Sequence, residues 1–237
     1  MEERQFRDRT EAGEQLATKL TVYADRPDVL VLALPRGGVP VAFEVARVLH
    51  ASLDVMIVRK LGIPGKEELA MGAIASGGVC VLNEDIVQML GIPEKVIHKV
   101  AAHERQELAR RERLYRGSRR AIDAHGRTVI LVDDGIATGA TMRAAVAAVK
   151  HLHPARIVIA VPVAAAATCE ELAVVADELV CILRPRDFFA LGFWYQSFAQ
   201  TTDEEVCDLL QQARHERLAT TQRRGKMPGV AHMLGAE

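Results

Sequence analysis

The chain has 237 residues, a formal net charge of -1, 49% hydrophobic residues and 26% charged residues. A chain of this length and composition can bury a substantial core as an ordinary globular protein. Its near-neutral charge gives no reason to expect nucleic acid or an anionic membrane as the main partner. No apolar run is long enough to span a membrane, the start lacks the apolar stretch of a signal peptide, and the four cysteines form no C-x-x-C pair. We therefore expect a cytoplasmic protein.

Short apolar runs alternate along the chain with longer helical patterns, which is typical of a parallel sheet covered by helices. The segment 59–68 contains two glycines and one proline and predicts a loop. Two apolar runs then flank Ser76-Gly77-Gly78, which predicts a hairpin. The remaining elements expected in this half are a helix at 10–24, a strand at 29–34, a helix at 41–49 and a strand at 54–58.

The second half of the chain continues the alternation after a charged interruption. From 83 to 120 the pattern is helical and rich in charge, and after about residue 214 it shows little periodicity. Between these stretches we expect strands at 127–134, 156–163 and 178–183, with helices at 140–152 and 168–176.

The segment VILVDDGIATGAT, at 129–141, carries the most chemical information. Its apolar residues predict a buried strand that ends at Asp133 and Asp134. A loop of small residues then leads into a helix, so loop N–H groups and the helix N-terminus would face one anion. Two acids beside that anion site fit a ligand with hydroxyls at one end and a phosphate at the other. The spacing matches neither a Walker A motif nor the G-x-G-x-x-G fingerprint, and a solvated Asp-Asp turn is the structural alternative.

Two further passages place basic residues after predicted strands. In LALPRGGVPVA, Gly37 and Gly38 permit unusual backbone angles, and Arg36 offers a fixed positive charge to an oxyanion. Arg59 and Lys60 form a basic pair after the second strand. From the residues alone, these passages also fit an ordinary βα turn and a solvated loop with a basic edge.

The segment 129–141 resembles the motif with which type I phosphoribosyltransferases bind 5-phosphoribosyl 1-pyrophosphate (PRPP). The resemblance implies an α/β fold with a central, mostly parallel sheet flanked by helices and a small hood, to which this chain adds a charged helical insertion. It also implies that Asp133 and Asp134 bind the ribose hydroxyls. The remaining implied PRPP-binding residues are Gly135, Ala137, Thr138, Gly139, Ala140 and Thr141.

By the same resemblance, the pyrophosphate of PRPP would be held by Arg36, Gly37, Gly38, Arg59 and Lys60. Arg36 and Lys60 would be catalytic together with the two acids, because they meet the charge on the leaving group. Family members often carry a strained or cis non-proline peptide here, for which Arg36–Gly37 is the candidate. The loop at 59–68 would close over the reacting centre, with Lys66 reaching in. Mg²⁺ is the implied cofactor, held mainly by PRPP and water.

The segment RPRDFFALGFWYQSF, at 184–198, holds four of the six phenylalanines and the only tryptophan. These rings could stack on a flat base, as in the variable hood of the family, or form a small core that closes the sheet edge. The candidates for the acceptor site are Asp187, Phe188, Phe189, Trp194 and Tyr195.

We predict one phosphoribosyltransferase domain at 1–213, with the insertion at about 83–125. The hood would comprise about 184–200 together with the N-terminal segment, and the tail at 214–237 would be flexible. For the charged part of the insertion, at 93–120, a solvated helix laced with ion pairs is expected, and dimer contact or anion steering is the alternative.

Two functions fit these expectations. The first is an enzyme of nucleotide metabolism or purine and pyrimidine salvage, a homodimer that joins ribose 5-phosphate from PRPP to a small-molecule acceptor. The second is a non-catalytic PRPP or nucleotide sensor. The presence of Arg36 and Lys60 favours the enzyme, because a sensor can lose its pyrophosphate-binding groups. FRDR near the start and WYQSF near the end are similar to a bacterial group of phosphoribosyltransferase-like proteins without a settled substrate.

Overall fold

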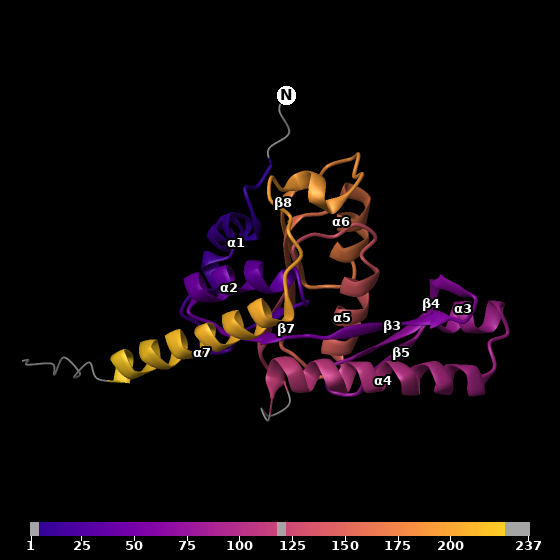
Figure 1. Cartoon of the computed structure of the whole chain (residues 1–237). Helices are drawn as coiled ribbons and strands as arrows, with labels where there is room; N and C mark the ends of the chain where they lie inside the picture. Colours follow the sequence, from indigo (N-terminus) through magenta and orange to yellow (C-terminus); the bar gives the residue numbers. More distant parts are fainter. Residues whose placement is uncertain (1–4, 118–121, 226–237) are drawn as a thin grey trace, which may run out of the picture.

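A computed structural model describes residues 5–117 and 122–225 (Figure 1). Its centre is a parallel sheet with the strand order β2-β1-β6-β7-β8. All residues of β1 and β6 are buried, because apolar runs of this kind form strands that are covered on both faces. The strands are β1 (Val29–Ala33), β2 (Ser52–Val55), β6 (Thr128–Val132), β7 (Arg156–Val163) and β8 (Glu178–Leu183).

Helices cover the two faces of this sheet and build two separate cores. Successive residues of a strand point to opposite faces, so Val31 belongs to the core beneath α2 and Leu32 to the core beneath α5. The first core also holds residues of α1 and α7, and the second holds residues of α6. The helices are α1 (Arg9–Thr18), α2 (Gly38–Leu49), α5 (Ala140–Lys150), α6 (Ala166–Ala173) and α7 (Asp203–Gly225), and the short 3-10 turns are η1 (Thr21–Tyr23) and η2 (Leu191–Trp194). The predicted α/β architecture is confirmed.

A second, antiparallel sheet of β3 (Val58–Ile63), β4 (Lys66–Ala75) and β5 (Val79–Leu82) projects to one side as an arm (Figure 1). The hairpin at Ser76-Gly77-Gly78 is confirmed, since β4 and β5 pair across it. The prediction of a loop at 59–68 is wrong, because β3 and β4 pair there as a hairpin.

Burial explains why the arm is a sheet. Leu61 and Met71 are fully buried, so packing outweighs the local signal of glycine and proline. Gly65 takes a φ of 78° at the turn, which glycine adopts without strain.

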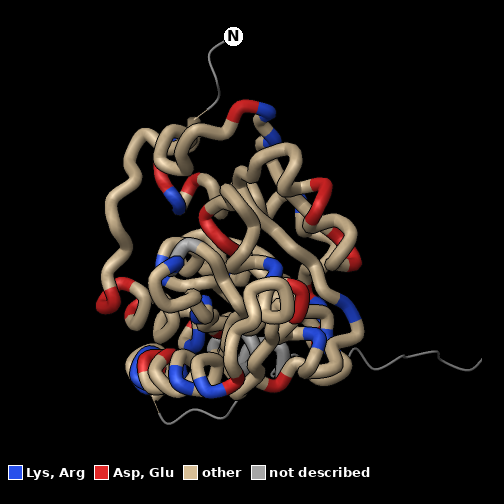
Figure 2. Tube along the Cα trace, turned by 90° about the vertical axis from the view of Figure 1, so that its right-hand side faces the viewer, with Lys and Arg blue, Asp and Glu red and all other residues tan. Residues whose placement is uncertain are grey.

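The charged insertion forms α3 (Glu84–Met89) and α4 (Glu94–Arg116), and α4 runs along the arm (Figure 1). On α4, Glu107 accepts hydrogen bonds from Arg110 and Arg111, as expected for a helix with (i, i+3) and (i, i+4) pairs. Acidic and basic residues are interspersed over the molecule (Figure 2). No helix among the described residues is long and apolar enough to cross a membrane. Part of the predicted insertion, 118–121, lies outside the described residues.

The end of the described chain is helical. Val206 and Leu210 are fully buried and fix the start of α7 against the body. The helix continues to Gly225, although the sequence shows little periodicity after about residue 214. The flexibility of this tail stays a prediction. Residues 226–237 lie outside the described part of the chain.

Candidate functional site

The loops that follow β1 and β6 lie against each other, because these strands are parallel neighbours. Two glycines permit the contact. A Cβ added to Gly37 would lie 2.0 Å from Asp134 Oδ2, and one added to Gly38 would lie 2.9 Å from Asp133 Cα. A side chain at either position would therefore displace the acid pair. The structure thus brings together the two loops for which the family resemblance implies binding of pyrophosphate and of ribose.

Arg36 lies in the first of these loops and is partly exposed. Its Nη1 atom is 3.8 Å from Asp203 Oδ1 at the start of α7, and the Tyr115 hydroxyl donates to the same carboxylate. The cis peptide bond is Pro35–Arg36 and not Arg36–Gly37, so that prediction was wrong by one residue. In this structure the Arg36 guanidinium is therefore ion-paired with a carboxylate of the protein itself.

The two acids at the end of β6 have different surroundings. Asp134 is buried, and its Oδ2 accepts a hydrogen bond of 2.7 Å from Arg9 Nε. Asp133 is partly exposed, and its Oδ1 accepts from the Asp134 N–H at 2.9 Å. Burial, and next the charge of Asp134, raise the pKa of Asp133 well above its usual value, while Arg9 opposes the rise. The acid pair therefore comprises one carboxylate bound by a guanidinium and one that is not.

Side chains of α5 and α6 hold the loop between β6 and α5 by hydrogen bonds. The Thr168 hydroxyl donates to the carbonyl of Ala137 at 2.7 Å, and Arg143 Nη2 donates to that of Thr138 at 2.9 Å. Gly139 has a φ of 72°, and a Cβ there would lie 2.8 Å from Thr168 Cγ2. The loop is thus fixed by α6 and by α5 itself.

The front of this loop is open. Ala137, Thr138, Ala140 and Thr141 are exposed, and α5 begins at Ala140. The first N–H groups of a helix have no partner within the helix, and the helix dipole favours a negative charge at this end. The arrangement is therefore suited to an anion such as a phosphate.

The predicted basic pair is divided between two faces of the arm, because neighbouring residues of a strand point in opposite directions. Arg59 Nε donates to Glu104 of α4 at 2.7 Å. Lys60 is exposed and lines a cavity of about 790 Å³ together with Ala140 and Thr141. Of the two basic residues, Lys60 is therefore the one that lies beside the loop between β6 and α5.

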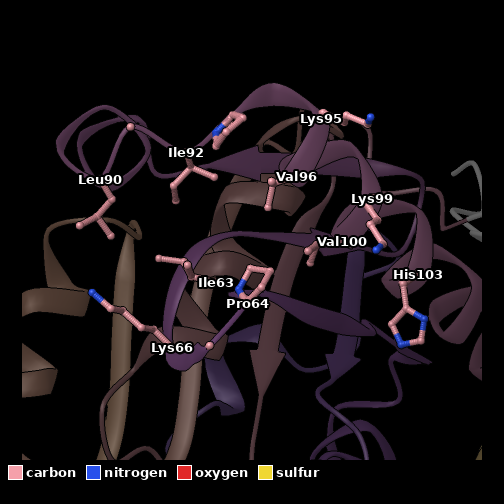
Figure 3. Close-up of a pocket in the computed structure, with 13 residues that line it drawn as sticks. Ile63, Pro64, Lys66, Leu90, Ile92, Lys95, Val96, Lys99, Val100 and His103 are labelled. Carbon is pink, nitrogen blue, oxygen red and sulfur yellow. The ribbon is translucent and has the colours of Figure 1, made fainter.

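Lys66 lies elsewhere, in a groove of about 820 Å³ between the β3–β4 turn and the start of α4 (Figure 3). Ile63 and Pro64 face Val96 across this groove, with Lys99 and other basic side chains at its rim. The groove shares no lining residue with the Lys60 cavity. Lys66 therefore lies outside the cavity that Lys60 lines beside the loop between β6 and α5.

Most of the aromatic segment packs inward. Trp194 and Tyr195 are buried and form a small core with Phe6, whose ring centroid is 5.6 Å from that of Tyr195. Phe188 is half-buried and stacks on Trp194, with centroids 6.3 Å apart. Asp187 and Phe189 are exposed. Trp194 and Tyr195 thus serve the small core, which was one of the two roles considered for these rings.

Sequence reasoning missed three residues that shape the site, namely Arg9, Arg143 and Thr168. Arg9 is the first residue of α1 and reaches Asp134 across a separation of 125 residues. Nothing in the local pattern around an exposed-looking FRDR segment indicates such a contact. Thr168 and Arg143 belong to ordinary helical patterns, and their role depends on how α6 and α5 pack around the loop.

A family model described as the phosphoribosyl transferase domain matches residues 7–197. The chain belongs to this family, and its fold is the type I phosphoribosyltransferase fold, as the motif at 129–141 predicts.

Proteins of similar sequence support this family assignment. Two proteins of Mycobacterium tuberculosis, named as candidate phosphoribosyl transferases, are each 45% identical over 211 residues, which is 89% of this chain and 47% of theirs. The chain therefore spans about half the length of these relatives. The crystal structure of TT1426 from Thermus thermophilus is 44% identical, with a TM-score of 0.79 over 88% of this chain and 98% of that one.

Proposed function

We propose that this protein transfers the ribose 5-phosphate group of PRPP to a nitrogenous base or a related nucleophile and releases pyrophosphate. The observation that supports this most directly is the end of β6, where two acids precede a loop and helix N-terminus suited to a phosphate. Asp133 and Asp134 are the proposed ribose-binding acids. The proposed 5′-phosphate contacts are Gly135, Ala137, Thr138, Gly139, Ala140 and Thr141.

The chemistry needs charge stabilisation more than a nucleophile from the protein. Displacement at the anomeric carbon passes through an oxocarbenium-like state, as in glycoside hydrolysis. The barrier falls when the leaving pyrophosphate is neutralised and the two reactants are aligned. Arg36 and Lys60 are the proposed catalytic cations, with the backbone of Gly37 and Gly38 beside them. The third predicted pyrophosphate contact, Arg59, is paired with Glu104 on the other face of the strand.

Mg²⁺ is proposed to bind together with PRPP. The described residues contain no group of three or more His, Cys, Asp or Glu side chains that could hold a metal ion. Asp134 is already bound by Arg9, so Asp133 is the carboxylate left to contact an ion at the ribose. That donor set fits a metal that takes most of its ligands from phosphates and water. When bound, the ion would supply positive charge to the pyrophosphate.

On the acceptor side, the exposed Asp187 and Phe189 and the half-buried Phe188 are the proposed contacts, since Trp194 and Tyr195 are buried. The setting that we propose is nucleotide salvage in the cytoplasm by a homodimer. A pyrophosphate-release assay tests the function, using PRPP, Mg²⁺ and a panel of purines, pyrimidines and small amines. Acceptor-dependent release supports the transferase, and PRPP binding without any release contradicts it.

The alternative function is a PRPP or nucleotide sensor without catalysis. One observation favours it: two of the three predicted pyrophosphate-binding cations, Arg36 and Arg59, are ion-paired with Asp203 and Glu104. A binding protein can tolerate such pairs, whereas a catalyst needs its cations directed at the leaving group. Substituting Asp203 by Asn separates the two functions. Release of Arg36 should speed turnover in an enzyme and leave a sensor without turnover.

A further inference from the structure

The Arg9 side chain makes three contacts beside Asp133 and Asp134. Its Nε donates to Asp134 Oδ2 at 2.7 Å, and its Nη1 donates to the carbonyl of Ala199 at 2.6 Å. The guanidinium carbon lies 4.0 Å from the centre of the Phe198 ring, within the range of a cation–π contact. The side chain is only 12% exposed. A guanidinium held in this way has lost the freedom of an ordinary surface arginine.

The segment that carries Arg9 is itself anchored. Phe6 is fully buried, its N–H donates to Trp194 O at 2.9 Å, and its carbonyl accepts from the Gln196 N–H at 2.8 Å. The hydroxyl of Tyr195, which lies between these two partners, donates to the backbone carbonyl of Asp134. The N-terminal segment at 6–9 and the segment around Tyr195 therefore hold Asp134 by its side chain and by its main chain.

The repulsion between the two acids explains why Asp134 needs a positively charged partner. Asp133 and Asp134 are adjacent acids at the end of a buried strand, so their charges repel in surroundings of low polarity. The charged or titratable groups that act on Asp133 are Asp134 and Arg9, and Tyr195 stands beside both acids. Arg36 is directed to Asp203. Arg9 is therefore the countercharge that contacts the pair.

We propose that Arg9 is a positioning residue of the ribose site, which holds the Asp134 carboxylate in one orientation and balances its charge. It acts through Asp134 and not by touching the sugar. The inference rests on the proposed function, because it assumes that the acid pair binds the ribose of PRPP. It adds that the N-terminal segment at 6–9 is part of the binding machinery, through one largely enclosed guanidinium.

The experiment is calorimetric titration with PRPP and Mg²⁺. At pH 7, Arg9→Gln should weaken binding about ten-fold or more, the effect of one charge-assisted hydrogen bond. Arg9→Lys should recover part of the loss, because it keeps the charge without the planar fork. Arg7→Gln is the matched control, since Arg7 lies two residues before Arg9, is 68% exposed and pairs with Glu11.

A double-mutant cycle decides whether Arg9 acts through Asp134. In an Asp134→Asn background, Arg9→Gln should cause little further loss. The cycle also serves if Arg9→Gln folds poorly, because Arg9→Lys can replace it. If the wild type binds PRPP, unchanged affinity in Arg9→Gln or fully additive losses in the cycle would overturn the inference alone. A wild-type protein that binds no PRPP would overturn the proposed function, and the inference with it.

Discussion

Replacing Gly37 by Ala tests the contact between the two site loops. The new Cβ would lie 2.0 Å from Asp134 Oδ2 and 2.6 Å from its Cγ. Contacts of a Cβ below about 3 Å are not tolerated in a packed interior, so one group must move by about 1 Å. A shift of Asp134 by that amount would break its 2.7 Å bond to Arg9.

The cost has two parts. Overpacking of this kind costs about 1–3 kcal/mol, and losing a hydrogen bond between charged groups costs about 1.5–3 kcal/mol. We therefore expect Gly37→Ala to lower the free energy of unfolding by roughly 2.5–6 kcal/mol. PRPP affinity should also fall by about ten-fold or more, because the displaced acid is one of the proposed ribose ligands.

Urea denaturation and calorimetric titration measure the two effects. An Asp134→Ala background supplies the control, because the atoms that the new methyl group would strike are absent there. In that background Gly37→Ala should cost little, and the coupling between the two sites should be large. Equal losses from Gly37→Ala in both backgrounds, or no loss in either, would refute the steric reasoning.

Three further predictions concern the acids, the basic pair and the loop. The pKa of Asp133 is raised in the folded state, so the native protein binds the proton of this carboxyl more tightly than the unfolded chain does. The free energy of unfolding therefore falls as pH rises from the ordinary aspartate pKa, about 3.9, to the raised pKa of the folded state. Asp133→Asn should raise the melting temperature at pH 7 by a few degrees and give no gain near pH 3, which calorimetric melts at the two pH values will show. Lys60→Ala should lower the rate of pyrophosphate release by about a hundred-fold, whereas Arg59→Ala, which removes a contact with α4, should change stability more than kcat. Thr168→Val should weaken the binding of ribose 5-phosphate several-fold in a fluorescence or calorimetric titration, since the carbonyl of Ala137 loses its partner; an unchanged affinity would show that α6 does not fix the loop.

The sequence was most informative where local pattern and burial agree. The apolar runs of β1, β6 and β7 are buried on both faces, so each was visible as a strand without knowledge of its neighbours. The acids and small residues after β6 follow the same logic, because strand, loop and helix are contiguous in the chain. Contiguous segments of this kind include the parts of the site at 32–42 and 129–141.

Prediction failed where distant contacts decide the structure. The hairpin at 59–68 depends on the burial of Leu61 and Met71, which overrides the turn-forming residues. The separation of Arg59 from Lys60 follows from that hairpin, because only a strand directs neighbours to opposite faces. Arg9 could not be assigned at all, since its partner lies 125 positions away.

The central claim is that the end of β6 binds PRPP through its two acids, and calorimetric titration with PRPP and Mg²⁺ tests it most directly. The comparison is between the wild type, Asp133→Asn/Asp134→Asn and a control that neutralises Glu204 and Asp208, two exposed acids of α7. We predict that the wild type and the control bind alike. The acid-pair variant should bind about a hundred-fold more weakly or worse, because it loses two hydrogen bonds to charged groups. Equal affinity in all three proteins, or no binding by the wild type, would contradict the claim.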